Sequence, residues 1–329
     1  MKEIKPLQTH FSSVFAPYED EYIGIHRALG KKFNTRTACA NQFDRYCIEN
    51  EIQSPVLSEE LFNGFCELRP NEAPMNRYHR VNFVREFAHF LSERGVESPI
   101  RFYPARMPKS GFMPHIFTAD EITRFFEAAD KMKPANYAII RHLIIPLLFR
   151  VLYCCGLRLG EALHLKNGDV DLQAGTLLIR NAKGDRDRLV PMSESLAQLC
   201  REYRADSQVR DFGGEYFFPS PDRGFYGNSS IQKPFRELLW QANIPHGGRG
   251  KGPRIHDFRH TFAVHTLSKW AQEGKDLYVC LPILSTYLGH CNLSGTQQYL
   301  RLVPENYDSV TVPFETHFGT VFPEVSGDD

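Results

Sequence analysis

The stretch "HDFRHTF", residues 256–262, determines which fold and which kind of site this sequence predicts. His256, Arg259 and His260 stand at positions i, i+3 and i+4, so a helix places them on one face. Two histidines four residues apart are typical of zinc-binding helices, whereas a histidine and an arginine near a helix N-terminus suit a phosphate. An arginine beside a dication is unfavourable, and no third ligand follows at a recognisable spacing. An anion therefore explains this stretch better than zinc.

The composition is that of an ordinary globular protein. The chain has 329 residues, of which 42% are hydrophobic, and this is enough for two domains with proper cores. The apolar run 139–155 is interrupted by two arginines, a histidine and a proline, so it predicts a buried helix and no membrane span. The N-terminus lacks the apolar core of a signal peptide, and the eight cysteines include no C-x-x-C pair. We therefore expect a cytoplasmic protein with reduced thiols.

Charge is distributed unevenly although the net charge is +0. Residues 1–100 carry 12 Lys/Arg against 14 Asp/Glu, and residues 101–303 carry 27 against 19. Residues 304–329 carry six acidic residues and no basic ones. A basic middle segment is compatible with binding to a polyanion such as nucleic acid, although the excess is modest for its length.

Four amphipathic helices are predicted in the first domain, residues 1–100, where they would form a small bundle. They are expected at residues 18–30, 35–49, 58–68 and 75–95. In the last of them the apolar residues recur at three- and four-residue spacing, with Arg77 and Arg80 on other faces. These arginines indicate either a solvated face or contact with DNA, and both interpretations stay open. The proline-rich stretch 101–113 predicts a linker.

The second domain, residues 114–303, is predicted to be mostly helical with a small antiparallel sheet. Thr118 and Glu121 in "FTADEI" form a capping box that starts a helix. A long apolar helix follows over about 136–155, and the runs "TLLIR" and "DRLVPM" alternate like strands around the "NAKGD" turn. Further helices are expected near 193–205, 229–243, 257–273, 281–289 and 295–302. The fold class is therefore mainly α with a small antiparallel β-sheet.

Two more motifs are weak when each is taken alone. In "CGLRLGEALHL", residues 155–165, Arg158 and Glu161 are spaced like an ordinary surface ion pair. In "YLGHCNLSGTQQYLRL", His290 follows a Leu-Gly turn and Tyr299 follows on a helix that Ser294 is expected to cap. A lone tyrosine is more often a packing residue, and Tyr287 and Tyr307 are nearby rivals.

Taken in order, these motifs resemble those of the tyrosine recombinases, the phage-integrase family. The residues that carry the resemblance are Arg158, Lys183 in "AKGDRDRLVPM", His256, Arg259, His290 and Tyr299. The resemblance implies a helical core-binding domain followed by a catalytic domain. It also implies that Tyr299 attacks the DNA backbone to form a 3′-phosphotyrosine, and that strand exchange proceeds through a Holliday junction without a cofactor or metal.

The resemblance also assigns roles to single residues. Arg158 and Arg259 are expected to clamp the phosphate, for which guanidinium groups are well shaped. His256 and His290 are expected to donate hydrogen bonds to it, with His256 the better candidate for a base. Lys183, on the predicted hairpin turn, is expected to be the general acid.

Supporting roles are expected for further residues. Glu161 and Asp257 are expected to orient the clamp, and Arg186 or Arg188 to face the DNA. His260 is expected to be a buried support residue outside the chemistry.

Partners follow from the same resemblance. Double-stranded DNA recombination sites are the expected substrate, bound by four protomers together with accessory DNA-bending or directionality factors. The glycine-rich loop 245–254 contains Arg249 and Lys251, and it either wraps DNA or is an ordinary loop. The tail 304–329 is expected to dock on a neighbouring protomer or on its own catalytic domain.

Several functions stay open at this stage. An integrase of a mobile element or phage is preferred, acting in the cytoplasm at the nucleoid. A chromosome-dimer resolvase is less favoured because of the long tail, and a type IB topoisomerase shares the chemistry. A DNA-binding regulator without activity and a zinc hydrolase are alternatives of other classes.

Overall fold

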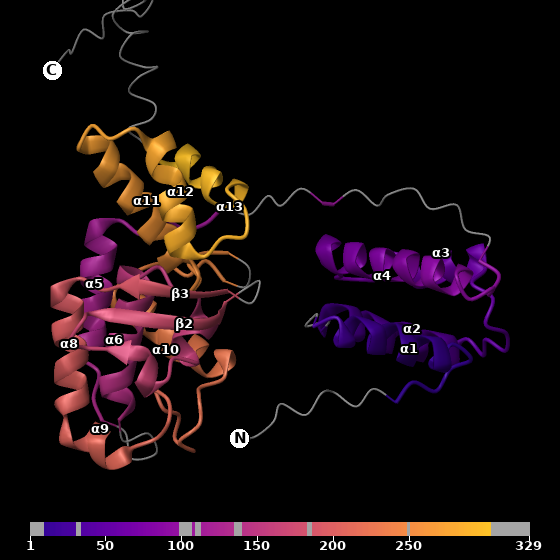
Figure 1. Ribbon diagram of the computed structural model, residues 1–329, viewed down its shortest axis with the longest axis horizontal. Coiled ribbons are helices and arrows are strands. Elements are labelled where there is room, and N and C mark those ends of the chain that lie inside the picture. Colours follow the sequence, from indigo (N-terminus) through magenta and orange to yellow (C-terminus); the bar gives the residue numbers. More distant parts are fainter. Residues whose placement is uncertain are drawn as a thin grey trace, which may run out of the picture. The chain divides into compact units, whose positions relative to one another are not determined.

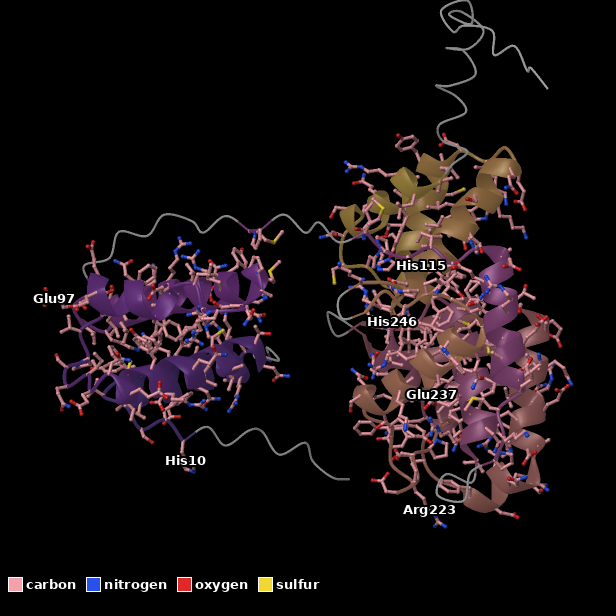
Figure 2. All side chains as sticks on the ribbon, turned by 180° about the vertical axis from the view of Figure 1, so that it is seen from behind. His10, Glu97, His115, Arg223, Glu237 and His246 are labelled. Atoms are coloured by element: carbon pink, nitrogen blue, oxygen red, sulfur yellow. The ribbon has the colours of Figure 1, made fainter. Side chains whose placement is uncertain are left out.

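The computed structural model divides into two compact units, Met1–Phe112 and Met113–Asp329. The described residues are 10–30, 34–98, 107–108, 113–134, 140–182, 186–248 and 251–303, without the side chains of 181, 182 and 186. Side chains fill the interior of each unit separately (Figure 2). No helix within these ranges is both long enough and apolar enough to cross a membrane.

The first unit contains the four helices that the sequence predicts. They are α1 (Ala16–Ala28), α2 (Asn34–Glu49), α3 (Glu59–Cys66) and α4 (Pro74–Ser92) (Figure 1). Their core is rich in phenylalanine, since Phe43, Phe65, Phe83 and Phe87 are all 0% exposed. The Phe43 and Phe65 rings meet edge to face with centroids 5.2 Å apart, an arrangement that aromatic rings favour.

Arg80 lies inside this core, so the prediction that it contacts DNA is wrong. Its side chain is 1% exposed, and its Nε donates to Glu72 Oε1 at 2.8 Å. The rest of the guanidinium binds the backbone oxygens of Phe65 and Glu67. A buried charge must be paired, and Glu72 supplies the pair. Arg77 is exposed, and its role in DNA binding stays a prediction.

The second unit is mainly helical with one small sheet, as the sequence predicts. Its helices are α5 (Ala119–Asp130), α6 (Arg141–Cys154), α7 (Leu159–Leu163), α8 (Glu194–Ala205), α9 (Ser207–Phe212), α10 (Asn228–Gln241), α11 (Asp257–Gln272), α12 (Leu277–Leu288) and α13 (Ser294–Gln297). Two 3-10 turns are η1 (Asn167–Asp169) and η2 (Gln298–Leu302). The antiparallel sheet has the order β1 (Val170–Asp171), β2 (Thr176–Ala182), β3 (Arg186–Pro191) (Figure 1).

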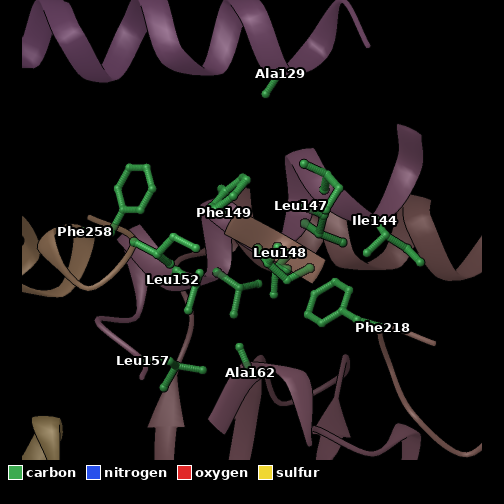
Figure 3. Packing of buried hydrophobic residues seen from close by; sticks show 14 of the residues in the cluster. Ala129, Ile144, Leu147, Leu148, Phe149, Leu152, Leu157, Ala162, Phe218 and Phe258 are labelled. Atoms are coloured by element: carbon green, nitrogen blue, oxygen red, sulfur yellow. The ribbon is translucent and has the colours of Figure 1, made fainter. Parts of the chain in front are cut away.

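Helix α6 is the centre of the second unit, because α5, α8 and α11 all pack against it. Leu148 and Phe149 on α6 are 0% exposed, and Phe258 on α11 packs against Phe149 with ring centroids 5.7 Å apart (Figure 3). The predicted capping box of Thr118 and Glu121 is present at the start of α5. The core therefore fixes α11, which carries the histidine and arginine motif.

Strand pairing explains the direction of Arg188. In the β2–β3 ladder Ile179 stands opposite Arg188, and directly opposed residues of an antiparallel pair share one face. Ile179 is 2% exposed, so Arg188 also points inward, with a side chain only 11% exposed. The register shifts beyond Ile179, and the turn residues 183–185, including Lys183, lie outside the described part of the chain.

Candidate active site

The C-terminal end of α12 is the structural centre of the site. Its last carbonyls have no partners within the helix and need other donors. Gly289, in the left-handed conformation with φ of 67°, donates its N–H to Thr286 O at 3.0 Å. The His290 N–H donates to Ser285 O at 3.0 Å. These turns place His290 directly after the helix.

Three arginines from three separate segments bind the next three carbonyls in order. Arg188 Nε donates to Tyr287 O at 2.9 Å, Arg259 Nη2 to Leu288 O at 2.6 Å, and Arg158 Nη2 to Gly289 O at 3.1 Å. A helix C-terminus carries a partial negative charge, which stabilises cations there. The two predicted clamp arginines are thereby held beside His290.

Arg259 is held from a second side as well. Its Nη1 donates to Gly156 O at 2.8 Å, and Gly156 has a φ of 59°. A Cβ at Gly156 would lie 2.5 Å from the Phe262 ring and 2.9 Å from Leu288, so glycine is needed at this position. Arg259 is only 1% exposed.

Glu161 joins Arg158 and Arg188. One carboxylate accepts from Arg158 Nη1 at 2.7 Å and from both terminal nitrogens of Arg188 at 3.1 and 2.9 Å. Burial alone would raise the pKa of Glu161, but the hydrogen bonds and charges of the two arginines outweigh it and hold that pKa below its ordinary value. Arg188 therefore supports the clamp, and the prediction that it faces DNA is wrong.

Asp257 has a different task from the one predicted. It is fully buried and accepts the Arg254 N–H at 2.8 Å, whereas Arg259 binds Gly156 and Leu288. Asp257 thus fixes the turn that leads into α11 and does not orient the clamp directly.

Tyr299 lies against this cationic group. Its ring belongs to an apolar cluster with Val264, Leu288 and Val303, and the residue is 1% exposed. Its hydroxyl lies 3.0 Å from His260 Nδ1. The predicted cap at Ser294 is wrong, because Leu293 is the N-cap and the Ser294 hydroxyl donates to Asn292.

The predicted histidines surround the tyrosine. The His290 ring stacks with the Tyr299 ring at a centroid distance of 6.3 Å, and His290 Nδ1 lies 2.6 Å from Thr296 Oγ1. His256, the N-cap of α11, meets the His260 ring edge-on at 4.8 Å. His256 is exposed, so the pocket has an accessible rim and a covered interior.

The positive charge of the pocket shifts its titrating groups. Burial, followed by the charge of Arg259, lowers the pKa of His290 to about 4. Burial and the neighbouring His256 lower the pKa of His260 to about 3. Burial raises the pKa of Tyr299, and Arg259 and Arg158 offset this only in part. The histidines are therefore neutral at pH 7 in the free protein, and the phenol is protonated.

The structure thus brings together five of the six residues predicted to be catalytic: Arg158, His256, Arg259, His290 and Tyr299. Lys183 and Arg249 lie outside the described residues, as does the side chain of Arg186. Lys251 is exposed. The sequence indicated no chemical role for His260, although its spacing from His256 places both histidines on one face of the helix.

Metal ligands do not gather at this site or elsewhere in the described ranges. No group of three or more His, Cys, Asp or Glu residues in them is placed to hold a metal ion. His260, one of the two histidines expected in a zinc helix, has its Nδ1 hydrogen-bonded to Tyr299.

Comparison with known proteins identifies the class to which this fold and pocket belong. The sequence profile described as "Phage integrase family" matches residues 115–306, which contain the whole pocket. The chain therefore belongs to the phage integrase family, and it is a tyrosine-type site-specific recombinase.

Similar proteins extend over both units. A protein of Sinorhizobium fredii with the provisional name integrase/recombinase y4rB is 33% identical over an alignment of 307 positions, which covers 89% of this chain and 94% of the relative. Tyrosine recombinase XerA of Thermococcus kodakarensis is 31% identical and covers 67% of this chain and 68% of its own. A lambda integrase tetramer bound to a Holliday junction has a similar fold, with a TM-score of 0.56, 15% identity, and coverage of 88% of this chain and 82% of its own.

Proposed function

We propose that the protein is the integrase of a mobile element or phage, and that Tyr299 is the nucleophile that cuts double-stranded DNA. The observation that carries this proposal is the position of the Tyr299 hydroxyl, bonded to His260 beside Arg259 and His290. A phenol needs a base or a positive field to attack at neutral pH. The pocket offers both.

The chemistry conserves bond energy. Tyr299 Oη attacks the phosphorus, the bond to the 5′-oxygen breaks, and a 3′-phosphotyrosine remains until a 5′-hydroxyl from the partner strand attacks it. Arg158 and Arg259 stabilise the charge that grows on the non-bridging oxygens. Lys183 protonates the departing 5′-oxygen, and no ATP is consumed.

DNA has to open the pocket before cleavage. Arg259 and Tyr299 are each 1% exposed, whereas His256 is exposed and the Arg158 side chain is 25% exposed. A phosphate therefore meets Arg158 and His256 first, and the segment that carries Tyr299, α13 and η2, moves to admit it. This order keeps the nucleophile covered until a DNA site is bound.

The remaining parts of the chain serve assembly on DNA. The first unit, with Arg77, acts as a core-binding domain, and Arg186, Arg249 and Lys251 contact the backbone near the cut. Four protomers join two sites through a Holliday junction, and the tail 304–329 docks on a neighbour. The similar fold of a lambda integrase tetramer bound to a Holliday junction supports the assembly of four protomers. Accessory DNA-bending or directionality factors act with it at the nucleoid.

The test is covalent capture of DNA. Nicked duplexes of randomised sequence are incubated with the protein without metal or ATP, and DNA that stays attached after denaturation in SDS is recovered and sequenced. The nick lets the short leaving strand diffuse away, so the adduct accumulates.

We expect an adduct with one enriched sequence, absent in Tyr299→Phe and retained in Tyr287→Phe. Tyr287 is a matched control because its hydroxyl donates to Pro191 O at 3.1 Å, at the end of β3. An adduct that persists in Tyr299→Phe would exclude Tyr299 as the nucleophile.

The recovered sequence also separates related functions. Ends of a mobile element indicate an integrase, whereas one chromosomal site indicates a dimer resolvase. A type IB topoisomerase would relax supercoiled DNA but would not form a Holliday junction from two such sites.

A further inference from the structure

His260 is hydrogen-bonded to the Tyr299 hydroxyl, which also has a side-chain hydrogen bond with Arg259. The two atoms, His260 Nδ1 and Tyr299 Oη, are 3.0 Å apart, within ordinary hydrogen-bond range. A neutral phenol has a single proton to donate, and a neutral imidazole accepts through its unprotonated nitrogen. In the tautomer that carries the ring proton on Nε2, Nδ1 accepts the phenol proton.

The other two pocket histidines are engaged elsewhere. His290 Nδ1 lies 2.6 Å from Thr296 Oγ1, and its ring lies flat beside the Tyr299 ring. His256 lies at the exposed rim and meets the His260 ring edge-on. Both are therefore suited to donate to a phosphate, whereas His260 is suited to act on the nucleophile.

The same helix supplies an internal comparison. His265 on α11 has its Nδ1 3.0 Å from the Tyr153 hydroxyl, the same contact at the same distance. Burial lowers the pKa of His265, and no arginine contributes to that shift. A His–Tyr hydrogen bond alone is thus a packing feature, and what distinguishes His260 is its cationic surroundings.

We propose that His260 is a catalytic residue which accepts the proton of Tyr299 when this tyrosine attacks the DNA phosphate. The inference rests on the proposed function and deepens it. In the step, the Oη–phosphorus bond forms, the Oη proton passes to His260 Nδ1, and the phosphorus–5′-oxygen bond breaks with Lys183 protonating the leaving oxygen. When the 5′-hydroxyl of the partner strand attacks, His260 returns the proton to Tyr299.

The charges around His260 make this transfer depend on bound DNA. In the free protein burial lowers the pKa of His260 most, and the charges of His256, Arg254 and Arg259 on its own segment and of His290 from the end of α12 lower it further. A phosphate between Arg158 and Arg259 brings negative charge that offsets these cations. His260 therefore becomes a competent base only when a phosphate is present, and the free enzyme does not ionise its tyrosine.

The test compares His260→Asn and His260→Phe with the wild type on the nicked duplex recovered by covalent capture. The Asn side-chain oxygen can stand where Nδ1 stands and accept the hydrogen bond, but it cannot take the proton. We expect both variants to bind the duplex as the wild type does and to form adduct about 100-fold more slowly, a typical loss for a general base. His265→Asn is the matched control and should cleave at the wild-type rate.

Two further readouts separate proton transfer from packing. The wild-type cleavage rate should rise with pH through the ionisation of His260 in the complex and then level off, whereas the His260→Asn rate should keep rising into the range of phenol ionisation. A fluorinated tyrosine at position 299, whose phenol ionises more readily, should restore most of the lost rate in His260→Asn.

The outcomes are distinct. Wild-type cleavage by His260→Asn, or no rescue by the fluorinated tyrosine, would reduce His260 to a packing residue and overturn the inference while leaving Tyr299 as nucleophile. Faster cleavage by either variant would make the contact a restraint, which also overturns it. Absence of any adduct in the wild type would instead remove the proposed function itself.

Discussion

The Arg188 guanidinium and the Glu161 carboxylate face each other with two hydrogen bonds, of 3.1 and 2.9 Å. Both side chains are largely buried, at 11% and 8% exposed, and the same carboxylate also binds Arg158. A buried pair loses far more when one partner is removed than an exposed pair does, because the other charge stays unpaired.

We therefore expect Arg188→Met to lower the free energy of unfolding of the second unit by about 3 kcal/mol. Urea denaturation followed by tryptophan fluorescence measures this unit alone, since both tryptophans, Trp240 and Trp270, lie in it. The control is Arg201→Met, which removes a surface pair with Glu194 whose side chains are 35% and 84% exposed, and it should cost less than about 1 kcal/mol. If both variants lost the same free energy of unfolding, the buried Arg188–Glu161 pair would stabilise the second unit no more than a surface pair does.

Gly289 is a second residue on which the two clamp arginines, Arg158 and Arg259, depend, because it lies in close contact with Arg188. Its φ is 67°, and a Cβ there would lie 2.9 Å from an Arg188 Nη nitrogen. We expect Gly289→Ala to destabilise the second unit by about 1–2 kcal/mol and to slow DNA cleavage, because His290 follows directly.

Gly24→Ala is the opposite case and serves as its control. Gly24 lies inside α1, and a Cβ there would have no heavy atom within 4 Å. Alanine should stabilise that helix by about 0.5–1 kcal/mol without any effect on cleavage. If Gly289→Ala left both stability and cleavage intact, the clamp would not depend on the left-handed cap.

Local sequence patterns predicted the helices and the order of the motifs. They could not predict which charged side chains are buried, because burial of a charge depends on partners from distant parts of the chain. Arg80 and Arg188 were expected at the surface because arginine side chains are usually exposed. Each is instead buried beside a carboxylate, Arg80 with Glu72 and Arg188 with Glu161. Likewise, nothing local indicates that His260 meets a tyrosine 39 residues later. The β2–β3 register that turns Arg188 inward also follows only from the folded sheet.

The pocket histidines predict how stability depends on pH. The folded pKa values of His260 and His290 are about 3 and 4, below the ordinary value of 6.5, so the unfolded chain binds more protons between these values. Stability contributed by the neutral rings is complete above pH 6.5 and is lost as the pH falls toward 4. We expect the second unit to lose several kcal/mol over this range, at most about 5, measured by urea denaturation with tryptophan fluorescence.

A double variant, His260→Asn with His290→Asn, tests the assignment of this loss. The slope of stability against pH between 6.5 and 4 should become shallower in it. An unchanged slope would mean that other groups, and not the two pocket histidines, take up the protons.

Glu19 predicts the opposite slope in the first unit. It is 0% exposed on α1 beside Asp44, which accepts the Ser12 and Ser13 N–H groups at 2.9 and 2.7 Å. Burial, and then the charge of Asp44, raises the pKa of Glu19 from 4.5 to about 9. Between these values the folded unit binds the extra proton, so its stability is complete below pH 4.5 and falls as the pH rises toward 9.

Glu19→Gln keeps the shape of the side chain and removes the titration, so we expect it to stabilise the first unit by about 1–3 kcal/mol at pH 8 and to have little effect at pH 5. Hydrogen exchange of the α1 and α2 amides measures this unit within the full chain. Glu21→Gln, on the same helix but in an exposed pair with Arg94, is the matched control and should give no gain at either pH, because it removes a favourable contact. Protection at pH 8 that is the same in Glu19→Gln as in the wild type would show that Glu19 is ionised at no cost in its buried position, with its charge compensated by a cationic group.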